Sequence, residues 1–168
     1  MEQILILPPD FDVGVNLETR KGSKIPTQRY HSRPPDAMRE ADRVQRTKFS
    51  RIKTRSLDST YNCVGMVFAF RRAWIEPKYV PKLLEEDEYR EVHRNEAVPG
   101  DLIVYYNNND RTAIRHVGII MKKEGNVEAG DWVIRVLRKW GQDGEYLHSE
   151  KDVPILFGTT RVYYSERK

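Results

Sequence analysis

The chain has little of what characterises secreted or membrane-spanning proteins. It contains one cysteine, Cys63, in 168 residues, which excludes an internal disulfide and a cysteine-rich zinc site. No stretch reaches the roughly 18 apolar residues that a membrane-spanning helix needs. The opening "MEQILILPPD" carries Glu2 where a secretory signal would be basic. We therefore expect a cytoplasmic protein that does not contact a membrane, with export as an effector as the alternative.

The residue patterns of a metal centre are also missing. The histidines, His31, His93, His116 and His148, show no ligand spacing, and one cysteine cannot supply a set of thiolates. The acidic run at 85–88 is typical of a solvated helix face. The sequence predicts no metal and no cofactor.

Basic residues are concentrated near the N-terminus. Residues 20–55 hold twelve Lys/Arg and three Asp/Glu, a net charge of +9, whereas the whole chain carries +4. Such a segment either docks on nucleic acid or another acidic surface, or lies as a solvated arm around the domain. Only Tyr30 and Phe49 offer rings for base stacking in it, which favours the second interpretation. Nucleic acid is therefore a secondary expectation as a partner.

The order of predicted elements favours an α+β fold. Surface helices are expected over about 37–50 and 80–90, and a helix that is apolar on all sides, hence buried, from Tyr61 to about Trp74. Segments rich in Val, Ile and aromatic residues follow, and their short connections are typical of an antiparallel meander. These strands are expected at 101–106, 113–122, 131–140 and 160–164.

The same pattern predicts two parts of the chain. Residues 1–55 form a basic N-terminal extension, irregular where prolines interrupt it. Residues 56–168 form one domain, in which the sheet packs on the central buried helix.

Cys63 stands where a polar segment turns into an apolar one, "STYNCVGMVFAF". Ser59 or Thr60 can cap the helix there, and a helix N-terminus favours the thiolate form of cysteine. A nucleophilic thiol also needs a base, and His116 is the best candidate, on a strand face shared with Gly118. The alternative is that Cys63 is a small core residue and His116 a structural one.

Three short blocks carry a family resemblance. "NCVGMV" (62–67), "PGDLIVYY" (99–106) and "HVGIIM" (116–121) resemble the signature blocks of the NlpC family of papain-like cysteine peptidases, relatives of the CHAP amidases. The resemblance covers about 60–165 and implies a papain-like fold. It implies Cys63 as nucleophile and His116 as general base. The backbone of Cys63, with Tyr61 or Asn62 nearby, would hold the oxyanion.

The chain departs from the family pattern at several positions. Asn62 and Val64 replace the family's aspartate and serine. A third polar residue is usual on the strand after the histidine. A hairpin centred on residue 126 would place 134–138 opposite His116, but the arginines there cannot accept a hydrogen bond from an imidazole. We therefore assign the third position to His148, with a backbone carbonyl or a water as alternatives.

These features predict a cysteine-dependent hydrolase or acyl transferase. It would act on an amide bond through a Cys–His thioester mechanism, and the resemblance implies a cell-wall peptide or a protein side-chain amide as substrate. The alternative is a catalytically inactive binding module of the same fold, whose basic arm docks an acidic partner or nucleic acid. The sequence does not favour a particular oligomeric state.

Overall fold

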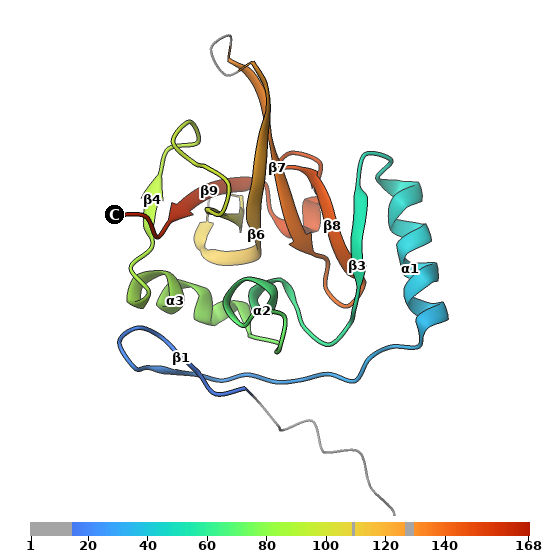
Figure 1. Cartoon of the computed structure of the whole chain (residues 1–168), viewed down its shortest axis with the longest axis horizontal. Helices are drawn as coiled ribbons and strands as arrows, with labels where there is room; N and C mark the ends of the chain where they lie inside the picture. The colour runs from blue at the N-terminus through green and yellow to red at the C-terminus, as the bar shows by residue number, and fades with distance from the viewer. Residues whose placement is uncertain (1–14, 109, 127–129) are drawn as a thin grey trace, which may run out of the picture.

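The fold is α+β, as the order of elements predicts. A computed structural model describes residues 15–108, 110–126 and 130–168. Within these residues, seven antiparallel strands form one sheet in the order β3-β8-β7-β6-β5-β9-β4 (Figure 1). Their bounds are β3 Lys53–Leu57, β4 Arg90–Val92, β5 Leu102–Asn107, β6 Asp110–Asn126, β7 Asp131–Lys139, β8 Gly144–Ser149 and β9 Thr160–Ser165.

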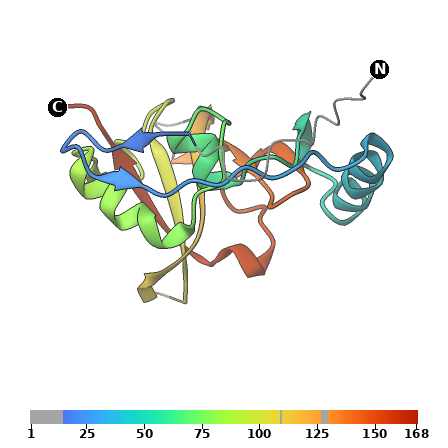
Figure 2. The same ribbon diagram turned by 90° about the horizontal axis from the view of Figure 1, so that it is seen from below.

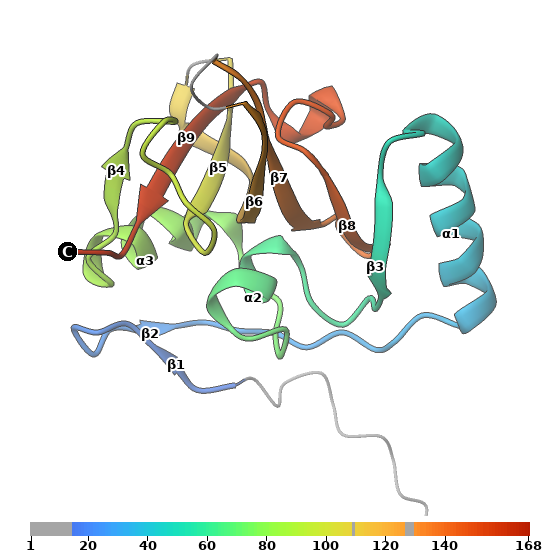
Figure 3. The same ribbon diagram turned by 45° about the horizontal axis from the view of Figure 1, so that its top comes forward.

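Helices and a short two-stranded sheet cover the large sheet. The helices are α1 Pro35–Lys48, α2 Cys63–Phe68 and α3 Val80–Glu86, with 3₁₀ turns η1 Pro77–Tyr79 and η2 Ile155–Phe157. β1 Leu17–Glu18 pairs with β2 Lys24–Ile25. α2 and α3 lie below the sheet with β1 and β2 beneath them, and α1 stands beside the edge strand β3 (Figure 3). None of the described helices has both the length and the apolarity to cross a membrane.

The four predicted strands are confirmed, but the meander is incomplete. β5, β6, β7 and β8 follow one another in the sheet, whereas β9 returns to pair with β5 on its other side. β8 and β3, which the sequence analysis did not predict, extend the sheet beyond β7. Their segments, "GEYLHS" and "KTRSL", carry too few β-branched residues to be recognised as strands.

The predicted helix from Tyr61 to Trp74 is wrong in length. The helix starts at Cys63, because the cap is Asn62 and not Ser59 or Thr60, and it ends at Phe68. The backbone turns left-handed at Phe70 and Arg71, with φ of 49° and 65°, which no α-helix can continue through. A six-residue helix does not support the expected central helix.

Each face of the sheet has its own apolar core. One cluster joins α2 and α3 to alternate residues of the inner strands, among them Val104 and Val117. A second cluster lies on the other face and includes Tyr105, Ile120 and Val136. Alternation along β6 therefore sends Val117 and its neighbour His116 to opposite sides of the strand.

The N-terminal segment runs across the helical side of the molecule (Figure 2). Ile25 is buried in the core, and Gln28 exchanges two backbone hydrogen bonds with Trp74, of 2.9 and 2.6 Å. The predicted boundary at residue 55 falls inside β3, while the irregular stretch at 1–14 lies outside the described residues. Part of the arm's positive charge is locally compensated, since Arg39, Arg43 and Arg46 pair with acids of α1.

Candidate functional site

Cys63 is the first residue of α2 and is 6% exposed. Burial raises the pKa of its thiol. Hydrogen bonding from the backbone of Val117, the positive charge of Arg138 and the backbone of Val64 oppose that rise. The thiol therefore faces the strand that carries His116, at the residue directly after it. In the resting structure it is protonated at neutral pH.

Asn62 fixes the start of α2. Its Oδ1 accepts hydrogen bonds from the backbone N–H of Gly65 at 2.9 Å and of Ile75 at 3.2 Å. Its Nδ2 donates to the carbonyl oxygen of Ile75 at 2.7 Å. The side chain thus ties the helix to the loop behind it and holds Cys63 in place.

Tyr61 belongs to a separate buried network. Its hydroxyl donates to Oε1 of Glu145 at 2.8 Å, and Arg71 pairs with the same carboxylate at 2.6 Å. Burial and this hydrogen bond raise the pKa of Tyr61. The structure thus directs both side chains proposed to assist the oxyanion, Tyr61 and Asn62, into bonds with the protein itself.

His116 is 2% exposed and its ring lies against Phe157, with 4.4 Å between ring centroids. Its Nε2 is buried and has no hydrogen-bond partner in the described part of the chain. Among the same residues no hydrogen bond links His116 to Cys63.

The expected position of His116 opposite residues 134–138 is wrong. Ile119 pairs with Leu137 and Ile120 with Val136, and the ladder continues to Asn126 and Asp131. The pairing of Ile119 with Leu137 centres the hairpin on residue 128 instead of 126, and a bulge between Ile120 and Lys122 changes the register by one residue.

Arg138 is the most unusual residue of the interior. Its side chain is fully buried, and Nε, Nη1 and Nη2 have no hydrogen-bond partner among the described residues. The guanidinium carbon lies 3.9 Å from the ring centroid of Tyr105 and 5.6 Å from that of Phe157. A Cβ on Gly118 would come within 2.4 Å of Arg138 Cγ. The glycine therefore makes room for the arginine to cross β6.

His148 is fully buried in β8. Its Nδ1 lies 2.7 Å from the carbonyl oxygen of Ser149 and must donate to it, which leaves Nε2 as an acceptor without a partner in the described residues. Burial, together with the charge of Arg138, lowers the pKa of His148 to about 3. The ring is therefore neutral, and its centroid lies 5.6 Å from that of Trp140.

These residues form one buried group, which we call the Arg138 cluster. The positive charge of Arg138 acts to lower the pKa of both Cys63 and His148. The Phe157 ring contacts both His116 and the Trp140 ring. The cluster comprises Tyr105, His116, Arg138, Trp140, His148 and Phe157. Cys63 adjoins it through the backbone of Val117.

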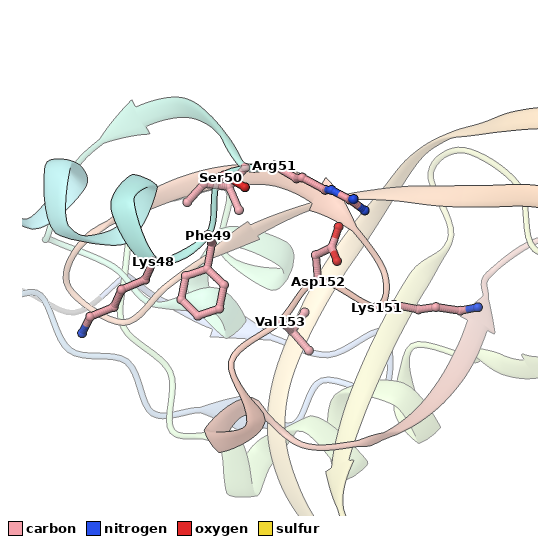
Figure 4. Close-up of a pocket in the computed structure, with 8 residues that line it drawn as sticks. Lys48, Phe49, Ser50, Arg51, Lys151, Asp152 and Val153 are labelled. Atoms are coloured by element: carbon pink, nitrogen blue, oxygen red, sulfur yellow. The ribbon is translucent and has the colours of Figure 1, made fainter.

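A pocket of about 350 Å³ lies outside the cluster, between the end of α1 and the segment after β8 (Figure 4). Phe49 and Ile52 line it, and both pack against Trp140. Arg51 points toward Asp152 across the opening (Figure 4). The other lining residues are Lys48, Ser50, Lys151 and Val153.

Sequence reasoning missed the two central residues of the cluster. It considered Arg138 only as an orienting group for His116, and it did not consider Phe157. Alternation along β7 was an available signal, because Ile134, Val136 and Arg138 share a face and the first two are clearly core residues. Phe157 lies in the short 3₁₀ turn η2 and offers no such signal.

Comparisons with protein-family models, with curated proteins and with solved structures found no significant match to this chain. Over the described residues, no group of three or more His, Cys, Asp or Glu is arranged to hold a metal ion. The candidate site therefore rests on the chemistry of its own residues.

Proposed function

We propose that the chain is a cysteine-dependent hydrolase or acyl transferase of the papain-like type that acts on an amide bond. The observation that carries the proposal is the position of the only thiol. Cys63 contacts the backbone beside His116, at the border of a cluster in which six buried side-chain nitrogens have no hydrogen-bond partner among the described residues. Protein interiors pair nearly all such groups, so a concentration of unpaired ones indicates function rather than packing.

In the proposed reaction His116 removes the proton from the Cys63 thiol. The thiolate attacks the amide carbonyl, and the backbone N–H of Cys63 donates to the oxyanion. His116 then protonates the leaving amine as the C–N bond breaks, which leaves a thioester on Cys63. Water or a second nucleophile releases the acyl group, so the same site serves hydrolysis or transfer.

His148 has the chemistry required of the third residue. A neutral ring whose Nδ1 donates to Ser149 presents Nε2 as an acceptor, and an acceptor is what an imidazolium at His116 needs. The neighbouring arginines cannot serve, because guanidinium groups only donate.

The resting arrangement is closed. The buried thiol packs with Val117 on the helical face of the sheet, whereas His116 points to the other face, so catalysis requires a rearrangement around β6 that brings the two side chains together. Catalytic hydrogen bonds are often incomplete before substrate binds. A cell-wall peptide amide and a protein side-chain amide remain the candidate substrates, from the resemblance of the three sequence blocks.

The test is alkylation of Cys63 by iodoacetamide across a pH series, in wild type, His116→Ala and His148→Ala. We expect His116→Ala to slow alkylation at neutral pH by about tenfold, because an imidazole base increases the reactive thiolate fraction. The exposed residue His93 supplies the control, His93→Ala, which keeps the wild-type rate. Equal rates in all variants at every pH would refute a Cys–His pair.

A second candidate, an inactive binding module, is favoured by the raised pKa and burial of Cys63. Its basic arm would then dock an acidic partner. Affinity for a DNA or RNA duplex that falls steeply with salt supports nucleic acid as that partner, because phosphate contacts release counterions. An affinity that does not change with salt argues against it.

A further inference from the structure

Arg138 carries a positive charge that the described residues do not neutralise. A guanidinium stays protonated inside a protein, and burying an unpaired charge is costly. The side chain is fully buried and its three nitrogens have no hydrogen-bond partner within the described ranges. The side chain of Tyr105 compensates only part of this cost, through a cation–π contact at 3.9 Å and the interaction of its hydroxyl with the guanidinium.

The nearby buried carboxylates are engaged elsewhere. Glu145 pairs with Arg71 and accepts from Tyr61. Glu150, at the end of β8, pairs with Arg94 and accepts from the hydroxyl of Tyr163. Among the described residues these carboxylates are therefore paired, and the buried Lys139 donates to the carbonyl oxygen of Gly141. Arg138 stands out as a buried cation held ready for an anion from outside.

The neighbours of Arg138 suit the same kind of ligand. The indole N–H of Trp140 is a donor, and it is buried without a partner among the described residues. Together with the planar fork of the guanidinium, it matches the several acceptor oxygens of a carboxylate.

We propose that Arg138 binds a carboxylate of the substrate, next to the amide carbonyl that Cys63 attacks. The substrate is thus an acidic amide, such as an acylated amino acid or a peptide with a free carboxylate beside the scissile bond. Naming the ligand as substrate rests on the proposed function, whereas the anion site itself does not.

The pocket at the end of α1 gives the route to this site. Val153 lines the pocket and leads directly into η2, whose Phe157 covers His116 and Arg138. Lys48, Arg51 and Lys151 surround the opening (Figure 4), against one acid, Asp152, among the lining residues. A positively charged entrance attracts an anionic ligand. Displacement of the Phe157 ring would connect the pocket to Arg138.

Only one side chain of the turn η2 lies in the cluster. Ile155 and Leu156 are 83% and 86% exposed, so Phe157 is the residue of η2 that packs inward. Gly158 follows with φ of 96°, a conformation that favours glycine. A Cβ there would come within 2.6 Å of the Tyr106 carbonyl oxygen.

The test is binding of N-acetyl-L-alanine, measured by calorimetry in Cys63→Ala, which cannot turn over. N-acetyl-L-alanine amide, which lacks the carboxylate, is the matched ligand control. We expect saturable binding of the acid, loss of about tenfold or more in affinity in Cys63→Ala/Arg138→Met, and no binding of the amide. Arg135→Gln, on the same strand and paired with Glu124 at the surface, is the control variant and keeps the affinity.

Equal binding of acid and amide, or unchanged binding in the Arg138→Met background, overturns the proposal. Absence of saturable acid binding in both Cys63→Ala and Cys63→Ala/Phe157→Ala overturns it as well, because the second variant removes the covering ring. If the acid binds but Cys63 is unreactive, the proposed enzyme is refuted and the anion site stands. If Cys63 is reactive but the acid does not bind, the anion site is refuted and the proposed enzyme stands.

A stability measurement separates this role from a structural one. Arg138→Met keeps the shape of the side chain and removes an unmatched charge, so we expect its thermal midpoint without ligand to exceed that of the wild type. A structural guanidinium would give a lower midpoint on the same replacement.

Discussion

The ring of Phe157 covers the imidazole of His116 at 4.4 Å between centroids, with 31° between the ring planes. The same ring lies 5.6 Å from the guanidinium of Arg138. One side chain of a short exposed turn thus closes off both the proposed base and the proposed anion anchor. The accessibility of the site should depend on Phe157 more than on any other residue of η2.

Phe157→Ala should therefore accelerate alkylation of Cys63. Removing the ring opens a path from the pocket beside α1 into the cluster, and we expect a rate increase of several-fold at constant pH. Iodoacetamide labelling followed by mass spectrometry measures it. Leu156→Ala, in the same turn but 86% exposed, is the control. Equal rates in the two variants would show that η2 does not limit access.

Gly118→Ala should destabilise the protein through Arg138. The added methyl would come within 2.4 Å of Arg138 Cγ and 2.7 Å of Val136 Cγ1, and overpacking of this kind costs about 1–3 kcal/mol. Urea unfolding at pH 7 measures the change. The double variant Gly118→Ala/Arg138→Ala lacks the clash with the arginine. Its loss of unfolding free energy should therefore be smaller than the sum of the losses in the two single variants, Gly118→Ala and Arg138→Ala. Strict additivity would mean that the arginine does not pass over Gly118.

The sequence predicted the elements whose residues carry regular patterns. Richness in Val, Ile and aromatic residues located β5, β6, β7 and β9, and the α+β class follows from their order after the helices. β8 was not predicted, because its segment begins at Gly144 and holds Glu145 and His148, and β-propensity alone assigns such a segment to a loop. The end of α2 was also not predicted, because the residue types of Phe70 and Arg71 give no indication of a left-handed backbone.

The site could be predicted only as far as residue types allow. Cys63 and His116 stand out as a thiol and a base in a suggestive order. The burial of Arg138 depends on the space left by Gly118 and on the Phe157 ring, which come from different parts of the chain. Charged residues are exposed in most proteins, so residue type alone favours an exposed arginine in "VIRVLRKWG". Tertiary packing overrode that preference.

Asn62→Ala should lower stability and release Cys63 from its position. The variant loses the cap to Gly65 and both bonds to Ile75, and a lost cap with an unsatisfied carbonyl costs about 2 kcal/mol. Chemical denaturation measures it. Ser59 also has a buried hydroxyl, which accepts from the backbone of Arg33, so Ser59→Ala is a control for loss of one hydrogen bond. A smaller loss in Asn62→Ala than in Ser59→Ala would contradict the role of Asn62.

The neutral His148 should make the protein sensitive to acid. Its pKa is lowered to about 3 in the folded state by burial and by Arg138, against about 6.5 when unfolded. Between these values the unfolded chain binds the proton and the folded chain does not. The contribution of the neutral His148 to the free energy of unfolding is thus complete above about pH 6.5. It is lost as pH falls toward 3, at up to about 1.4 kcal/mol per pH unit.

His148→Gln should flatten this dependence, because glutamine does not titrate. Urea unfolding of both proteins at several pH values between 4 and 7.5 measures the difference in slope. His93→Gln, at an exposed histidine, should leave the slope unchanged. If His148→Gln also left it unchanged, the pKa of His148 would be the same in the folded and unfolded chain, so the fold would not hold the ring neutral. Below about pH 6.5 its Nε2 would then be a donor, unable to accept a hydrogen bond from His116, and the third position of the proposed site would have to be a backbone carbonyl or a water.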